Sequence, residues 1–198
     1  GATTATLELW EVDNAVLAAS MPRKMRCLVA DDLAFNRRLL NRFLTRMEPF
    51  CKLDWEVQDC ATGEEVLTKV VSNDETFDVI FMDEHMEQAG GDLRGSETIQ
   101  RIVQHFSDKR IHKSRPICIT TSGNCLSEDC DTYLARGADH VLGKPLPNCF
   151  GLAREVFRVI QKRVQEGEEE EGEAAVDSLP TPAGDGYWDR PSKRARIE

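Results

Sequence analysis

Between residues 25 and 165, short runs of apolar residues alternate with longer stretches in which apolar positions recur every three or four residues. The short runs have the length and content of buried β-strands. We expect strands at residues 26–30, 53–60, 77–82, 116–120 and 139–142. The longer stretches have the spacing of one helix face, and we expect helices at residues 35–47, 62–72, 96–106, 126–136 and 149–165. The pattern predicts five consecutive strand–helix units.

The ends of two predicted helices carry additional signals. Thr62 begins the helix at residues 62–72, and Glu65 follows it three residues later, which is the spacing of a capping box. Gly137 directly follows the helix at residues 126–136, and glycine readily takes the left-handed conformation that ends many helices. These signals support the predicted boundaries.

Strands that are apolar throughout and joined by helices are typical of a parallel sheet covered on both faces. Right-handed crossovers then give a doubly wound α/β fold. We therefore predict one domain of this class over residues 25–165. In such open sheets the functional cleft lies at the carboxyl ends of the strands, so the residues that follow each strand are the candidates for chemistry.

Segments of different composition flank this domain. Residues 1–24 alternate enough for one strand and a short helix before the break at Met21-Pro22-Arg23-Lys24, and we interpret them as a leader or linker. Residues 166–198 hold ten acidic and four basic residues, and residues 166–173 are nearly all Glu and Gly. Such a segment repels itself and cannot build a core, so we expect an acidic, disordered tail.

Composition and charge restrict the function classes further. The net charge of −10 disfavours a broad nucleic-acid-binding surface. No apolar run approaches the roughly 18 residues of a membrane span, and the first twenty residues lack the basic and apolar segments of a secretory signal. Seven cysteines without a C-x-x-C pair are typical of reduced thiols in an intracellular protein, so we expect a cytoplasmic location.

Charged and hydroxyl side chains follow four of the predicted strands. Asp31 and Asp32 follow the first strand, Asp83 the third, Thr121 the fourth and Lys144 the fifth. Three clustered carboxylates repel one another unless a cation joins them, and oxygen-only ligands favour Mg²⁺. A carboxylate held beside Mg²⁺ and a lysine can attack phosphorus and form an acyl phosphate.

Each of these residues also has a simpler interpretation. Asp31 and Asp32 could cap the helix that follows them. Thr121 could be one more turn residue, and Lys144 could be a solvated loop lysine. Asp83 is harder to explain in this way, because an acid after four apolar residues at the end of a buried strand needs a partner.

Four segments, in this order, resemble the receiver domain of two-component phosphorelays, and most resemble receivers attached to hybrid histidine kinases. They are Leu28-Val29-Ala30-Asp31-Asp32 with Asn36-Arg37, Phe77-Asp78-Val79-Ile80-Phe81-Met82-Asp83, Pro116-Ile117-Cys118-Ile119-Thr120-Thr121-Ser122, and Gly137-Ala138-Asp139 leading to Lys144-Pro145. The resemblance covers about residues 25–163. It implies a flavodoxin-like receiver fold with the strand order 2-1-3-4-5.

The resemblance also implies a metal site at the strand ends. Asp83 resembles the phosphoacceptor of the family. Asp32 resembles the direct Mg²⁺ ligand, and Asp31 would bind the ion mainly through water. The backbone carbonyl of His85, two residues after the acceptor, would be the third protein ligand.

Two further roles concern the phosphoryl group itself. Thr121 resembles the switch hydroxyl that bonds a phosphoryl oxygen. Lys144 resembles the lysine that pairs first with the acceptor and then with the phosphoryl group. In the family the peptide bond between this lysine and the following proline, here Pro145, is cis, which prolyl bonds adopt at low cost.

The loop after Asp83 departs from the family pattern. The family usually has a proline where Glu87 stands, and its glycine before the next helix comes about four residues sooner than Gly95. We therefore interpret residues 88–94 as containing a four-residue insertion. Its two adjacent glycines favour a longer, flexible loop beside the phosphorylation site.

Three further positions bear on output and autodephosphorylation in the family. Val141 stands at the aromatic switch position, so output through a rotating aromatic ring is not expected. His85 and Gly123 occupy the two positions that tune autodephosphorylation, and Gly123 offers no side chain to hold a water. His85 could equally be a solvent-facing loop residue.

The ends of the chain carry two weaker signals. Residues 1–10 resemble the last strand of a histidine-kinase ATP-binding domain, which would make the chain part of a hybrid kinase; a linker is the alternative. No phosphoaccepting histidine motif or nucleotide-binding loop occurs, so we expect no kinase catalytic domain in this chain. The run Lys193-Arg194-Ala195-Arg196 could act in nuclear import.

The function that the resemblance implies is a receiver that catalyses its own Mg²⁺-dependent phosphorylation on Asp83. The donor would be a histidine kinase or a histidine phosphotransfer protein, and the product would switch protein interactions or pass the phosphoryl group onward. The alternative is a receiver-like interaction module that is not phosphorylated, which the insertion and Val141 favour. A haloacid-type hydrolase is disfavoured, because His85 stands where that class has a second aspartate.

Overall fold

The computed structural model describes residues 24–51, 53–108 and 110–177. Its centre is a five-stranded sheet in which every neighbouring pair of strands is parallel. The strands are β1 (Lys24–Ala30), β2 (Asp54–Cys60), β3 (Val79–Asp83), β4 (Ile117–Ser122) and β5 (His140–Gly143). Their order across the sheet is β2-β1-β3-β4-β5, as predicted.

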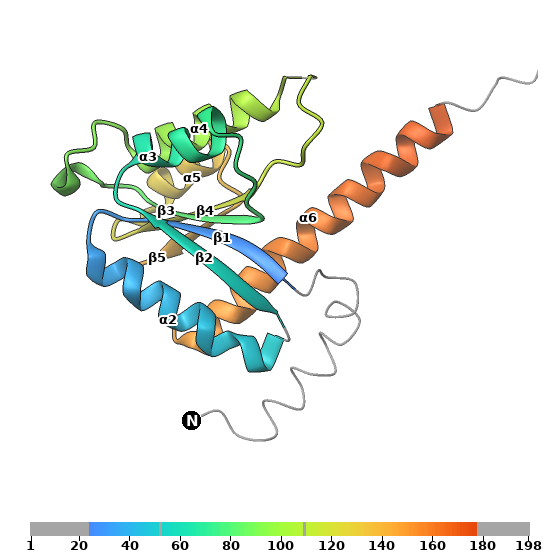
Figure 1. Ribbon diagram of the computed structural model, residues 1–198. Coiled ribbons are helices and arrows are strands. Elements are labelled where there is room, and N and C mark those ends of the chain that lie inside the picture. The colour runs from blue at the N-terminus through green and yellow to red at the C-terminus, as the bar shows by residue number, and fades with distance from the viewer. Residues whose placement is uncertain (1–23, 52, 109, 178–198) are drawn as a thin grey trace, which may run out of the picture. The chain divides into compact units, whose positions relative to one another are not determined.

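Helices cover both faces of this sheet (Figure 1). One face carries α2 (Ala34–Cys51) and α6 (Cys149–Asp177), and the other carries α3 (Gly63–Leu67), α4 (Gly95–Phe106) and α5 (Ser127–Ala135). The interior is accordingly divided into two hydrophobic clusters, one on each side of the sheet. This arrangement confirms the doubly wound α/β class.

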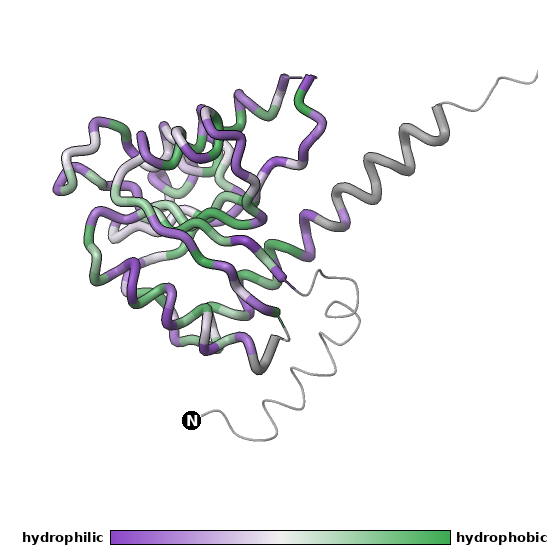
Figure 2. Tube along the Cα trace, viewed as in Figure 1, coloured by the Kyte–Doolittle hydropathy of each residue, from purple (hydrophilic) through white to green (hydrophobic). Residues whose placement is uncertain are grey.

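The alternation of side chains along each strand explains why the strands are apolar throughout. Phe81 and Ile119 point into the cluster under α2 and α6, whereas Ile80 and Cys118 point into the cluster under α3, α4 and α5. Both sides of every central strand are therefore buried. Figure 2 shows the result, a hydrophobic sheet between helices whose outer surfaces are hydrophilic.

The predicted helix at residues 62–72 is present in a modified form. Residues Gly63–Leu67 are α-helical, and Thr68–Ser72 continue as one wider π-helical turn. The Thr62 hydroxyl accepts the N–H of Glu65 at 3.2 Å, as expected. The Glu65 carboxylate, however, accepts the N–H of Ala61 at 2.7 Å rather than that of the cap residue. The capping box therefore reaches one residue further back than we expected.

Two boundaries differ from the sequence-based expectation. β1 begins at Lys24, which we assigned to the leader. α6 continues beyond Gln165 to Asp177, through the Glu-rich segment that we expected to be disordered. Helical hydrogen bonds are local and Glu is a good helix former, so this segment needs no hydrophobic core to be helical.

The chain divides into two compact units, one ending at Arg163 and one beginning at Val164. The sheet, the helices from α2 to α5 and the part of α6 up to Arg163 belong to the first unit. The possible kinase-like strand at residues 1–10 and the basic run Lys193-Arg194-Ala195-Arg196 lie outside the described residues. No helix in the described part of the chain is both long and apolar enough to cross a membrane.

Gly95, the first residue of α4, packs directly against the end of β3. A Cβ atom at this position would overlap the carbonyl oxygen of Asp83 and would lie 2.8 Å from Cγ of Met82. We predict that Gly95→Ala lowers the free energy of unfolding by about 2–4 kcal/mol, because backbone rather than a flexible side chain must shift.

Urea unfolding of both this variant and Gly123→Ala would test the prediction. Gly123 has nothing within 4 Å of the added carbon, so we expect its alanine variant to stay within about 0.5 kcal/mol of the parent. Equal stability of the two variants would contradict the proposed close approach of α4 to β3.

Candidate functional site

Three carboxylates converge at the carboxyl edge of the sheet. Asp31 and Asp32 follow β1, Asp83 ends β3, and these two strands are neighbours. One carboxylate oxygen from each residue lies within 4.8 Å of the others. Asp31 and Asp83 are buried, so their charges cannot be solvated freely. The structure thus brings together the three acids that the sequence predicted.

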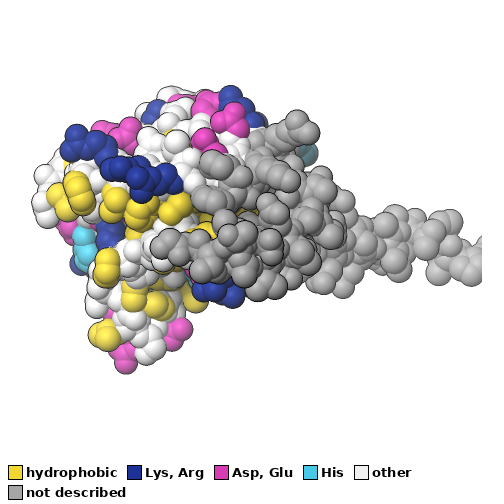
Figure 3. Space-filling model, turned by 90° about the horizontal axis from the view of Figure 1, so that it is seen from below, with side chains coloured by type: hydrophobic (Ala, Val, Ile, Leu, Met, Phe, Trp, Pro, Cys, Tyr) yellow, Lys and Arg dark blue, Asp and Glu magenta, His cyan; other side chains and the backbone are white. Residues whose placement is uncertain are grey.

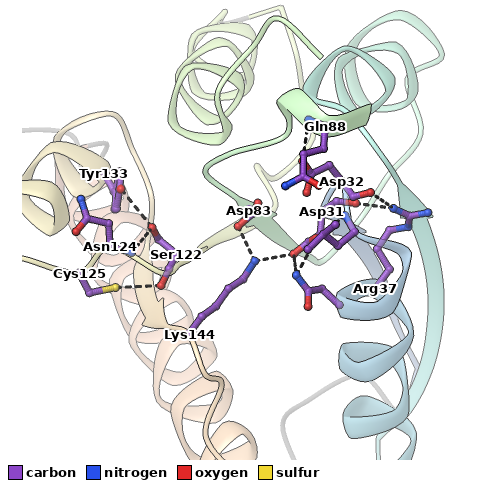
Figure 4. A network of polar contacts seen from close by, with 12 residues as sticks. Asp31, Asp32, Arg37, Asp83, Gln88, Ser122, Asn124, Cys125, Tyr133 and Lys144 are labelled. Atoms are coloured by element: carbon purple, nitrogen blue, oxygen red, sulfur yellow. Dashed lines mark hydrogen bonds and ion pairs between the residues drawn. The ribbon is translucent and has the colours of Figure 1, made fainter. Parts of the chain in front are cut away.

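Lys144 joins two of these acids (Figure 4). Its Nζ donates to Oδ2 of Asp31 at 2.7 Å and to Oδ1 of Asp83 at 2.6 Å. Burial by itself lowers the pKa of Lys144, but the hydrogen bonds to Asp31 and Asp83 raise it above its ordinary value. The lysine therefore remains an ammonium ion. The Lys144-Pro145 peptide bond is cis, as expected.

The environment of Asp83 makes its ionised form less favourable than in water. Burial raises its pKa to about 6; Lys144 opposes this effect, and the neighbouring charges of Asp31 and Asp32 add to it. Burial is therefore the main reason that the ionised form of Asp83 is disfavoured, and repulsion by the two neighbouring acids is a smaller one. A divalent cation at this position would remove the remaining repulsion.

Asp31 is held in place by the first turn of α2. The side-chain amide of Asn36 donates to both carboxylate oxygens of Asp31 at 3.0 Å, and the N–H of Leu33 donates to one of them at 2.9 Å. Arg37 bonds the carbonyl oxygen of Asp31 at 2.6 Å and the carboxylate of Asp59 at 2.7 Å. The sequence indicated Asn36 and Arg37 only as part of a family pattern. Their roles became visible only with the fold.

Thr121 lies beside the acceptor strand. In the register of β3 and β4 it is aligned with Asp83, and it is buried. It lines a cavity of about 250 Å³ together with Lys144 and Asp31. This placement fits the predicted switch hydroxyl. Its role toward a phosphoryl group remains a prediction.

Ser122 connects this edge of the sheet to α5. Its carbonyl oxygen accepts the backbone N–H of Lys144 at 2.7 Å. Its hydroxyl lies 3.4 Å from the hydroxyl of Tyr133, a buried residue of α5 (Figure 4). Sequence reasoning missed Tyr133, although it noticed that Val141 on β5 is not aromatic. An isolated tyrosine on a predicted helix carries no signal for such a contact.

The loop after Asp83 is folded rather than extended into solvent. It contains a short 3-10 helix (Glu87–Ala89), and the N–H of Gln88 donates to Oδ2 of Asp32 at 3.0 Å. Further along, the N–H groups of Asp92 and Leu93 bond the carboxylate of Glu64 on α3. Asp32 and Glu64 thus both bond the backbone of this loop, and the flexibility expected from its two adjacent glycines stays a prediction.

His85 is exposed at the start of this loop, and its ring Nδ1 lies 3.5 Å from the Glu87 carboxylate. The part of its backbone carbonyl in metal binding remains a prediction.

Glu84, by contrast, is buried beside the acceptor and was missed by sequence reasoning. Its carboxylate accepts the N–H of Ser96 at 2.8 Å and the Ser96 hydroxyl at 2.9 Å. Arg136, directly after α5, donates to the same hydroxyl at 2.8 Å, so Glu84 and Ser96 connect the loop to α4 and to the end of α5.

The donor set fits a magnesium ion. Asp31, Asp32 and Asp83 offer only carboxylate oxygens, which are hard ligands. Burial is the main reason that the pKa of Asp83 is raised, and the charges of Asp31 and Asp32 add to it, so a cation beside the three acids would be favourable. Asp32 is only partly buried, which leaves the cluster open to an ion and its waters.

Comparisons with known proteins agree with this geometry. The chain matches the response regulator receiver domain family over residues 27–149. It is 31% identical over 121 residues to stress response regulator protein 1 of Candida tropicalis, covering 61% of this chain and 40% of that protein. It is 28% identical over 119 residues to the protein of the same name from Candida albicans, covering 60% and 37%. The chain thus spans less than half the length of these curated relatives.

Solved structures show the same fold. A response regulator from Chloroflexus aurantiacus is 20% identical, with a TM-score of 0.55 over 70% of this chain and 98% of that one. CheY of Borrelia burgdorferi, solved with CheX, BeF3 and magnesium, is 19% identical, with a TM-score of 0.56 over 73% and 93%. The Ssk1 receiver of Saccharomyces cerevisiae, solved with the histidine phosphotransfer protein Ypd1, is 20% identical, with a TM-score of 0.53 over 69% and 88%.

The raised pKa of Asp83 predicts that this acid costs stability at neutral pH. Because its folded-state pKa of about 6 lies above the ordinary value of 3.8, the cost is present above pH 6 and disappears as the pH falls toward 4. We expect Asp83→Asn to raise the metal-free free energy of unfolding at pH 7.5 by about 1–2 kcal/mol, a value discounted for partial solvation.

Urea unfolding without Mg²⁺ at pH 7.5 and pH 4.5 measures this effect, and the gain should shrink at the lower pH. Asp131→Asn, which removes an exposed acid of α5, is the control and should change stability little. A less stable Asp83→Asn variant at pH 7.5 would show that pairing with Lys144 outweighs the repulsion.

Proposed function

The chain belongs to the response regulator receiver domain family, and on this basis we propose that it is the phosphoacceptor of a histidine-to-aspartate phosphorelay. Asp83 is the residue that becomes phosphorylated. The observation that carries the proposal is the position of Lys144, whose ammonium group bonds both Asp83 and Asp31. This arrangement holds a carboxylate nucleophile next to a fixed positive charge and two further acids.

In the proposed reaction an oxygen of the Asp83 carboxylate attacks the phosphorus of a phosphohistidine on a partner. The new O–P bond forms as the N–P bond breaks, and the leaving imidazole nitrogen takes a proton from solvent. Lys144 then transfers its hydrogen bond from the carboxylate to a phosphoryl oxygen. Thr121, aligned with Asp83 on β4, supplies a hydroxyl to another phosphoryl oxygen.

Asp32, Asp31 and Asp83, with the backbone carbonyl of His85, would hold the Mg²⁺ ion. When bound, the ion offsets the negative charge that gathers on the phosphoryl oxygens. The residues of the chain position the reacting groups. Asn36 and the N–H of Leu33 hold Asp31, and Lys144 holds Asp83.

Phosphorylation adds a charge of roughly −1.5 to −2 at the edge of the sheet. Lys144 and Ser122 share a backbone hydrogen bond, and the Ser122 hydroxyl faces Tyr133 of α5. A movement of Lys144 and Thr121 toward the phosphoryl group therefore also displaces β4 and α5. We propose that the surface formed by β4, α5 and β5 is the one that changes its interactions.

The matched region covers 40% and 37% of the two Candida relatives, which are named stress response regulators. Membership in a hybrid histidine kinase rests on the resemblance of the receiver segments to receivers of such kinases and on that of residues 1–10 to a kinase strand. Six cysteines are unpaired, which fits a reducing compartment and supports a cytoplasmic or nuclear location; they are Cys27, Cys60, Cys118, Cys125, Cys130 and Cys149.

A partner can approach Asp83 over α2. Arg38, Arg42 and Arg46 recur every four residues and are exposed, and none forms an ion pair with another residue in the described ranges. Phe35 is 68% exposed and lines the same cavity as Lys144. Figure 3, seen from the side on which α2 lies, shows Lys and Arg side chains next to exposed hydrophobic ones. We propose that this surface docks a histidine phosphotransfer protein; the Ssk1 receiver was solved in complex with such a protein, Ypd1.

The direct test is the intact mass of the protein after incubation with acetyl phosphate, with and without Mg²⁺. We expect the mass to rise by one phosphoryl group only when Mg²⁺ is present, because the ion offsets charge on the transferring group. Asp83→Ala should abolish the gain, whereas Asp131→Ala, which removes an exposed acid of α5, should not.

If the parent protein gains no mass under conditions that label a control receiver, a beryllofluoride titration must follow. Beryllofluoride binding that requires Asp83 would indicate a short-lived acyl phosphate. Failure to bind would favour the alternative function, an interaction module that keeps the fold without being phosphorylated.

The docking proposal predicts that Arg42→Glu slows phosphotransfer. With phosphorylated Ypd1 as donor, we expect the rate to fall about tenfold at low ionic strength and less at high salt, because charge steers association. Labelling by acetyl phosphate should be unchanged. The control is Arg101→Glu, an exposed arginine on α4 at the opposite face of the sheet. Equal rates for both variants would place docking elsewhere.

A further inference from the structure

The loop that separates Asp83 from α4 is fixed to α3 by a single carboxylate. Oε1 of Glu64 accepts the backbone N–H of Asp92 at 3.1 Å and that of Leu93 at 2.9 Å. Gly91, just before them, is buried; a Cβ there would lie 3.2 Å from the Met86 carbonyl oxygen and 3.3 Å from Oε2 of Glu64. The far half of the insertion is therefore packed closely against this glutamate.

Glu64 is suited to this contact in its ionised form. It stands in the first turn of α3, where a negative charge is favourable. Burial raises its pKa, but hydrogen bonds from its own backbone and from the N–H groups of Leu93 and Asp92 together bring the pKa below its ordinary value. Hydrogen bonds to an ionised carboxylate are about twice as strong as neutral ones. The two hydrogen bonds from Asp92 and Leu93 to Glu64 therefore hold the loop strongly against α3.

The near half of the same loop bonds Asp32. The N–H of Gln88 donates to Oδ2 of Asp32, and among the described residues it is the one hydrogen bond that this carboxylate receives. Asp31, by contrast, receives bonds from Leu33, Asn36 and Lys144. The orientation of Asp31 is therefore set by α2 and Lys144, whereas that of Asp32 depends on the loop.

We propose that Glu64 is a positioning residue for the metal site, acting through the insertion. By fixing Asp92 and Leu93 it fixes the loop, and the loop then places the Gln88 N–H on one oxygen of Asp32 and leaves the other oxygen for the ion. Groups that hydrogen-bond a metal ligand typically change metal affinity 10–100-fold when removed. The inference rests on the proposed function, since it assumes that Asp32 binds Mg²⁺.

The arrangement has a reciprocal consequence. If the fixed loop strengthens Mg²⁺ binding, bound Mg²⁺ must stabilise the fixed loop by the same factor. Mg²⁺ binding would then change the stability of a surface loop beside the phosphorylation site. The four-residue insertion is on this view part of the metal site rather than a neutral loop.

Isothermal titration of Mg²⁺ into the full chain tests the proposal with a matched pair of variants. We expect Glu64→Ala to weaken Mg²⁺ binding about tenfold. Glu65→Ala removes the same charge from the same turn of α3, but its carboxylate bonds Ala61 rather than the insertion. It should therefore change Mg²⁺ affinity by less than a factor of two to three. Equal affinities of the two variants, or tighter binding by Glu64→Ala, would overturn the proposal.

Amide hydrogen exchange supplies a readout that does not depend on phosphorylation. In the parent protein, Mg²⁺ should slow exchange at Gln88, Asp92 and Leu93. In Glu64→Ala these amides should exchange faster and respond less to Mg²⁺. Exchange at Gln88 that ignores the substitution would contradict transmission through the loop.

Two outcomes separate this inference from the proposed function. If the parent protein binds no Mg²⁺, the metal site and the role of Glu64 both fail. If it binds Mg²⁺ and the Glu64 and Glu65 variants behave alike, only the role of Glu64 fails. Circular dichroism checks that each variant is folded. Glu64→Gln keeps an acceptor oxygen, so it should lose less Mg²⁺ affinity than Glu64→Ala.

Discussion

The site depends on one ammonium group placed between two buried carboxylates. Lys144 bonds Asp31 and Asp83 at 2.7 and 2.6 Å, and it compensates only part of the charge of the three-acid cluster. Burial raises the pKa of Asp83, and the charges of Asp31 and Asp32 add to this effect. The same three carboxylates form a cluster that could hold a metal ion. Three acids beside one lysine leave a net negative charge, which favours the binding of a cation.

The sheet makes this placement possible. Because all five strands are parallel, their carboxyl ends meet at one edge, and the order β2-β1-β3-β4-β5 puts Asp31 and Asp83 on neighbouring strands. Two hydrophobic clusters, one on each face, hold the strands in this register. The polar residues at the edge can therefore repel one another without opening the fold, since the apolar core below them supplies the stability.

The contacts around the site connect it to several surface elements. Asn36 and Arg37 tie Asp31 to α2, and Ser122 connects Lys144 to Tyr133 of α5. Glu84 and Ser96 attach the segment after Asp83 to α4. A change of charge at Asp83 consequently reaches three helices over short paths. The absence of an aromatic ring at Val141 does not leave the site isolated from α5.

The amino-acid pattern by itself determined the five strands, the parallel sheet and the acids, hydroxyl and lysine at its edge. This was possible because strand and helix periodicities are local, and because a parallel sheet collects all strand ends on one side. It did not determine where α6 ends or that Thr68–Ser72 form a π-helical turn.

Only the tertiary structure decided how the site is supported. The bond from Gln88 to Asp32 joins residues 56 positions apart, and the bond from Asp92 to Glu64 joins residues 28 apart. Glu64 and Glu65 look alike in the sequence, yet one bonds the insertion and the other bonds Ala61. Such contacts depend on the path of a loop through space, and residue type and spacing along the chain do not specify that path.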